Sequence, residues 1–251
     1  SLSALLVSAS MDAHLSRPSA APQPSRRQLG EMAPSELAAR VALVEAVRDL
    51  NLAAATAFAD DEELARATES VRRLTEDLKP LGVERVIRSR FEEPADWART
   101  GRSMPINLLN PALPELLISF TGDWAAADAA GDPTGLGASA TLVANSLHEG
   151  PTDSLHGGVS ALLMDCILGF LVQAWGEPAV TGNLTTRYLA RTPLEEDLHL
   201  SSRVSARSGR KITVTGTIEH AGGVCVEASG LFVVIDRATF RSSLPRPPAD
   251  D

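Results

Sequence analysis

The chain has 251 residues, enough for one domain of ordinary size with additional segments. Its hydrophobic fraction of 44% can form a core, and its formal net charge of −9 argues against a nucleic-acid-binding protein. The two cysteines, Cys166 and Cys225, lie in apolar runs and cannot form a disulfide framework, so we expect a reduced, cytoplasmic protein. The five scattered histidines show no metal-site spacing, and no metal is expected.

The N-terminal segment 1–33 is rich in Ser, Ala, Pro and Arg and has no periodicity, so we expect it to be disordered. No basic region precedes its apolar residues, which argues against a secretory signal. The chain begins with Ser, and Met11 and Met32 are candidate start residues.

Segment 34–82 is predicted to be a helical hairpin extension. Apolar residues of 35–58 recur at helical spacing, and a second apolar series runs at heptad-like spacing to Lys79. Between them, Asp60 and Glu63 resemble a capping box. We expect the hairpin to pack against the rest of the chain or against a partner subunit, and a lid or a docking module is the alternative.

Segment 83–114 has several prolines and charges and is expected to be an irregular connector, and 122–137 is expected to be a loop. A domain over 115–240 and a flexible tail over 241–251 follow. Its predicted strands are 116–121, 138–147, 179–189, 197–207, 211–220 and 224–235. A strictly alternating pattern in 211–219 is typical of a half-buried antiparallel strand.

The most informative stretch is 148–175, where a glycine-rich loop enters an almost wholly apolar helix. Such a helix must be buried, yet it is too short and interrupted for a membrane span. It carries one carboxylate, Asp165, whose burial would cost several kcal/mol without a partner. Gly157 and Gly158 leave backbone N–H groups open at the helix N-terminus, which stabilises negative charge. The pattern predicts an α+β fold in which a curved antiparallel sheet wraps around the helix, closed by a second subunit.

Three motifs carry a family resemblance: HEGP…HGGVSALLMD, TGNLTTRYLARTPL and GRKITVTGTIEHAGGVCVEASGLFVV. Together they resemble the hotdog-fold acyl-CoA thioesterases of the phenylacetate-degradation (PaaI-like) group over roughly 116–236. The resemblance implies hydrolysis of an acyl-CoA thioester, with CoA as part of the substrate and no cofactor. It also implies a homodimer or a tetramer.

The resemblance also assigns roles to residues. Asp165 is implied as the general base or nucleophile, with a structural polar group as the alternative. Gly157 is implied as the oxyanion donor, and Gly158 as a second donor or a packing residue. His156 is expected to shape the loop, with direct catalysis less favoured.

Thr181 and Asn183 are implied, across the subunit interface, as residues that position water; polar side chains of a strand are the alternative. Arg207, Arg210 and Lys211 cluster at a turn that suits the phosphates of CoA, although a solvated charged hairpin is the commoner explanation for any one of them. Two other functions are compatible with parts of this pattern. A non-catalytic hotdog module that binds acyl-CoA or a partner is the main alternative. A hotdog enoyl-CoA hydratase is disfavoured, because those relatives carry Asp and His about five residues apart, with Asp first.

Overall fold

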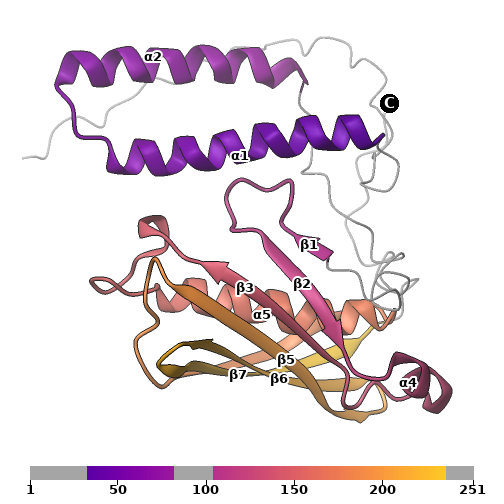
Figure 1. Cartoon of the computed structure of the whole chain (residues 1–251). Coiled ribbons are helices and arrows are strands. Elements are labelled where there is room, and N and C mark those ends of the chain that lie inside the picture. The colour runs from indigo at the N-terminus through magenta and orange to yellow at the C-terminus, as the bar shows by residue number, and fades with distance from the viewer. Residues whose placement is uncertain (1–32, 82–103, 236–251) are drawn as a thin grey trace, which may run out of the picture.

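The computed structural model of the protein describes residues 33–81 and 104–235. The expectations for 1–32, for most of the connector and for the tail therefore lie outside the described residues. Figure 1 shows a sheet curving around one long helix, with two further helices above its β1–β2 end.

The long helix α5 (Gly157–Ala174) forms the centre of the core, as predicted. Its buried residues are Ser160, Leu163, Met164, Ile167, Leu168, Leu171, Val172 and Ala174. By length and composition α5 is the one helix of the described part that passes as a candidate membrane span. This is weak evidence, because helices buried in the core of soluble proteins pass the same test.

Seven strands of the described residues form an antiparallel sheet in the order β1-β2-β3-β5-β6-β7-β4. Their bounds are β1 Met104–Ile106, β2 Leu116–Thr121, β3 Gly137–Val143, β4 Ala179–Tyr188, β5 Asp197–Ser208, β6 Lys211–His220 and β7 Gly223–Val234. In the central strands, alternate residues such as Leu200, Val214 and Val226 are fully or almost fully buried toward α5. This is the predicted hotdog fold.

The helix lies close to the sheet because β6 carries Gly216 beneath it. A Cβ at this position would lie 2.8 Å from Cε of Met164 and 2.9 Å from Cδ1 of Leu168. It would also collide with the carbonyl oxygen of Ser201. Glycine at 216 therefore sets the spacing between helix and sheet.

Three local predictions were wrong. The connector contains the short strand β1, which pairs with β2. The expected loop 122–137 contains helix α4 (Trp124–Ala130), which Asp123 caps by accepting a hydrogen bond from Ala126 N–H. The strand expected over 138–147 ends at Val143 and is followed by the 3-10 turn η3 (Ser146–His148).

The predicted helical hairpin is present as α1 (Pro34–Thr56) and α2 (Asp61–Leu78), followed by the 3-10 turn η2 (Lys79–Leu81). Asp60 caps α2 by accepting a hydrogen bond from Glu63 N–H at 2.8 Å, as the capping motif predicts. Neither helix contains a buried residue.

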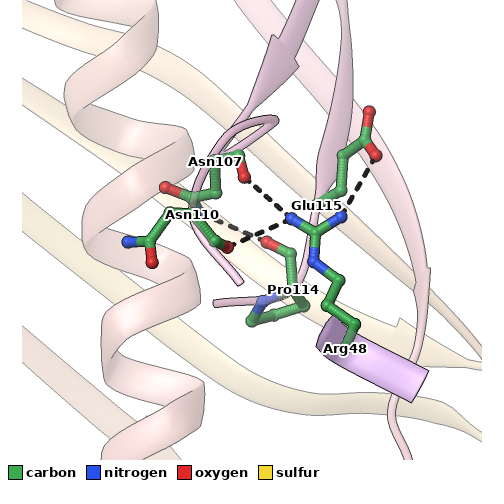
Figure 2. A network of polar contacts seen from close by, with 5 residues as sticks. All are labelled: Arg48, Asn107, Asn110, Pro114 and Glu115. Atoms are coloured by element: carbon green, nitrogen blue, oxygen red, sulfur yellow. Dashed lines mark hydrogen bonds and ion pairs between the residues drawn. The ribbon is translucent and has the colours of Figure 1, made fainter. Parts of the chain in front are cut away.

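Helix α1 contacts the turn between β1 and β2 mainly through Arg48 (Figure 2), and Asn51 adds a hydrogen bond to the carbonyl oxygen of Pro111 at 3.5 Å. Arg48 donates to the carbonyl oxygens of Asn107 at 2.8 Å and Asn110 at 3.2 Å, and its guanidinium lies 3.6 Å from Glu115. The side chain of Asn107 in turn donates to the carbonyl of Pro114. The turn is thus stabilised both by its own hydrogen bond and by the contacts from α1.

Strand β4 ends the sheet at the side opposite β1. Within the described residues it pairs only with β7, so its other edge carries unpaired backbone groups. Most of its side chains are exposed in the single chain. This open edge lies beside α5, where the candidate site is found.

Candidate active site

The loop entering α5 ends in a capped helix N-terminus. His156 is the N-cap residue, and its Nδ1 accepts a hydrogen bond from Gly158 N–H at 2.9 Å. An Nδ1 that accepts a hydrogen bond carries no proton. The structure therefore gives His156 the loop-shaping role, and it engages the Gly158 N–H that the sequence offered as a second oxyanion donor.

The N–H of Gly157, in contrast, donates no hydrogen bond within 33–81 and 104–235. The Gly157 carbonyl accepts a hydrogen bond from the Tyr188 hydroxyl at 2.8 Å, and the ring of Tyr188 covers the glycine. A free N–H at a helix N-terminus is the geometry that an oxyanion requires. The sequence analysis did not single out Tyr188, although it is the only tyrosine of the chain and lies within the motif TGNLTTRYLARTPL.

Asp165 lies on the partly exposed side of α5, beside the open edge of the sheet. Its Oδ1 accepts a hydrogen bond from the hydroxyl of Thr181 at 2.9 Å. The carboxylate is half-buried rather than enclosed in the single chain, contrary to expectation. The sequence resemblance implied that Thr181 positions water across the subunit interface, whereas here its hydroxyl bonds Asp165 of the same chain.

Asn183 is not brought to Asp165. A β-bulge separates Thr181 from Asn183, so Thr181 pairs with buried Phe232 whereas Asn183 pairs with Leu231. Directly paired residues share a face of the sheet, so the bulge turns Asn183 to the side away from α5. There the Asn183 Oδ1 accepts a hydrogen bond from Thr185.

The basic turn between β5 and β6 is present, but two of its three cations are engaged. Arg207 forms an ion pair with Glu177 at 2.7 Å, and the Nε of Arg210 donates to the carbonyl oxygen of Val234. No such contact involves Lys211 within the described residues. The turn lies at the far end of β5 from the loop that leads to Gly157.

Gly157 and Asp165 of one chain cannot act on the same carbonyl group. They are eight residues apart on one helix, which places them about 12 Å apart along its axis at 1.5 Å per residue. Groups that act on one reacting centre lie about 3 Å from it. Within one chain the two groups therefore do not complete a single site.

Residues 153–227, which include Gly157, Asp165 and Thr181, match the family model described as the thioesterase superfamily. A crystal structure of a thioesterase superfamily protein is 27% identical, with a TM-score of 0.62 over 77% of this chain and 90% of that one. No curated protein matches the chain.

Two more distant structures resemble part of the chain. A phenylacetic acid degradation-related protein from Ralstonia eutropha JMP134 is 20% identical, with a TM-score of 0.40, over 47% of this chain and 84% of that one. A Streptococcus mutans UA159 protein bound to acetyl CoA is 21% identical, with a TM-score of 0.38, over 41% of this chain and 82% of that one.

Two ionisable groups near the candidate site, Cys166 and His148, are poor candidates for a nucleophile or a base. Burial, and secondly the charge of Asp165, raise the pKa of the Cys166 thiol, which keeps it protonated and unreactive. Burial lowers the pKa of His148, which lies in η3 before the glycine-rich loop. Asp165 is thus the group in the described part best placed for acid–base or nucleophilic work.

A hollow of about 650 Å³ lies on the outer face of the sheet, away from the candidate active site. Its lining is mainly serine and threonine, with Arg187, Arg203 and Glu227. It contains neither Gly157 nor Asp165 and offers no group suited to attack a thioester.

Proposed function

We propose that the protein is an acyl-CoA thioesterase of the phenylacetate-degradation (PaaI-like) group that works in the cytoplasm as a homodimer or larger assembly. The observation that carries the proposal is the Thr181–Asp165 hydrogen bond beside an open sheet edge, on the helix that begins with the free N–H of Gly157. The thioesterase-superfamily match over the same residues supports it.

In the proposed mechanism, the Gly157 N–H of one subunit donates to the carbonyl oxygen of the thioester. The Asp165 carboxylate of the other subunit removes a proton from water as the water oxygen bonds to the carbonyl carbon. Collapse of the tetrahedral intermediate breaks the C–S bond, and the proton passes to the sulfur, giving free acid and CoA. In the nucleophilic variant, Asp165 first forms a mixed anhydride that water then hydrolyses.

Each residue has a physical reason for its role. The Gly157 N–H is held at the positive end of the α5 dipole, where negative charge develops on the oxygen. Thr181 holds the Asp165 carboxylate in one orientation. A carboxylate that is already oriented loses less conformational freedom when it reacts. At the basic turn, Lys211 is the cation best suited to a CoA phosphate, since Arg207 and Arg210 are engaged within the chain.

The test is thiol release from short, medium, long and aromatic acyl-CoAs by the native protein, Asp165→Asn and the control Asp197→Asn. Asp197 is exposed at the start of β5, so its variant should keep full activity. Asp165→Asn should stay folded and bind CoA, with turnover reduced by several orders of magnitude. Full activity of this variant would exclude the role of Asp165.

CoA binding without hydrolysis of any acyl-CoA by the native protein would favour the non-catalytic module. Turnover in heavy-oxygen water separates the two catalytic routes, because only the nucleophilic route places the label in the Asp165 carboxylate.

A further inference from the structure

The loop from Glu149 to His156 places the proposed oxyanion donor, yet it contains no helix or strand of its own. Short internal contacts shape it. Gly150 N–H donates to the carbonyl of Ser154 at 2.9 Å, and Asp153 N–H donates to the Glu149 carboxylate at 2.7 Å. Such contacts shape the loop but do not fix it relative to the sheet.

Arg191, which follows β4, provides an attachment to the sheet. Its Nε donates to Oγ of Ser154 at 2.8 Å, and its Nη2 donates to the carbonyl oxygen of Thr152. Ser154 is only 3% exposed, so the guanidinium binds the loop at a buried residue. Two donors in one rigid plane constrain the orientation of the loop as well as its distance.

Arg191 is itself anchored. Its carbonyl oxygen accepts a hydrogen bond from the buried thiol of Cys225 at 3.3 Å. The following residue, Thr192, accepts a hydrogen bond from Leu155 N–H at 2.9 Å. The guanidinium therefore joins the loop to the β4–β7 edge of the sheet.

This edge also contacts Gly157 itself, because Tyr188, three residues before Arg191, donates to the Gly157 carbonyl oxygen. The segment from Tyr188 to Thr192 thus contacts the chain before and after the Gly157 N–H. A hydrogen bond weakens steeply when its angle degrades, so the direction of this N–H matters as much as its presence.

We propose that Arg191 is a positioning residue, which fixes the direction of the Gly157 N–H by holding the loop 149–156 on the sheet. This rests on the proposed function. Arg191 does not touch the reacting atoms, and its own contribution is to the rate of the chemical step rather than to CoA affinity.

The experiment compares Arg191→Met and Arg191→Lys with Arg187→Met. Arg187 lies on the same strand segment but is exposed and paired with Glu227, away from the loop. We expect Arg191→Met to lower kcat about 10- to 100-fold with an unchanged KM, in line with a displaced reacting group or oxyanion donor. Arg191→Lys should recover part of this loss, because it keeps the charge without the planar fork. Arg187→Met should match the native protein.

Ser154→Ala provides a milder variant that removes one of the two bonds of Arg191, together with the bond from the Ser154 hydroxyl to the carbonyl oxygen of Thr152. Its loss in kcat should be smaller, and the double variant Arg191→Met/Ser154→Ala should lose no more than Arg191→Met alone. Additive losses would overturn the proposal, as would a native kcat for Arg191→Met.

Hydrogen exchange supplies a readout that does not depend on turnover. Backbone amides of 150–157 should exchange faster in Arg191→Met than in Arg187→Met, while amides of β6 stay protected. Unchanged exchange in the loop would overturn the proposal even if the protein hydrolyses acyl-CoA. Absence of thiol release from the native protein would instead defeat the proposed function, and the exchange comparison would still decide whether Arg191 holds the loop.

Discussion

Replacing Thr181 with valine removes the hydroxyl that bonds Asp165 while keeping the size and shape of the side chain. The bond is 2.9 Å long and joins a neutral donor to a carboxylate. Hydrogen bonds to charged groups contribute about 1.5–3 kcal/mol. If the whole of this contribution orients the reacting carboxylate, and 1.36 kcal/mol corresponds to tenfold in rate, kcat should fall about 10- to 150-fold.

The assay is thiol release at saturating acyl-CoA. Thr181→Ser keeps the hydroxyl and should remain close to the native kcat. Thr141→Val provides a matched control, because Thr141 lies on an exposed position of β3, on the face of the sheet away from α5. Thr181 is exposed and valine favours strands, so the melting temperature should change little. A native kcat for Thr181→Val would refute the idea that the hydroxyl positions Asp165.

Three further predictions concern the scaffold. Arg48→Met should expose α1 to limited proteolysis, because it removes the contacts of Arg48 to the β1–β2 turn. Arg40→Met, on the same helix, should not change the cleavage rate. Equal cleavage rates for the two variants would contradict the role of Arg48. Gly216→Ala should lower the free energy of unfolding by about 1–3 kcal/mol in urea, since the added methyl meets Met164 and Leu168; an unchanged midpoint would contradict the tight spacing. Burial lowers the pKa of His148 below 6.5, so protonation favours the unfolded chain, and the free energy of unfolding should fall as the pH falls below that value. His148→Asn should reduce this loss of stability. An identical pH profile for the variant and the native protein would contradict the role of His148.

Long and regular patterns allowed accurate sequence predictions. Strand 211–220 was predicted at its observed bounds because threonines alternate with apolar residues that face α5. The apolar residues of 159–175 predicted a core helix because burial leaves no polar face. Asp60 predicted the start of α2 because a cap is a local interaction.

Short elements were missed because they show no period. Strand β1 has three residues, one of them Pro105, and it exists only because β2 offers an edge. Helix α4 was taken for a loop because of its alanine and glycine content, although Asp123 and Gly131 are its helix caps. Gly131 adopts a φ of 64°, which glycine tolerates.

The candidate site was predicted in part. The glycines and Asp165 were found because they interrupt an otherwise apolar pattern. The bulge that separates Thr181 from Asn183 was not, since the extra residue, Gly182, looks like any glycine in a strand. The contacts of Tyr188 and Arg191 depend on how the end of β4 meets the loop, which spacing along the chain does not encode.

The attachment of α1 through Arg48 has a consequence for sequence divergence. Two of the three groups that Arg48 contacts are main-chain carbonyl oxygens, at Asn107 and Asn110, which every residue type possesses (Figure 2). Substitutions that keep the turn conformation leave these acceptors in place. The N-terminal helices can therefore stay attached while the side chains of the turn diverge, and the arginine is the part of the contact under the stronger constraint.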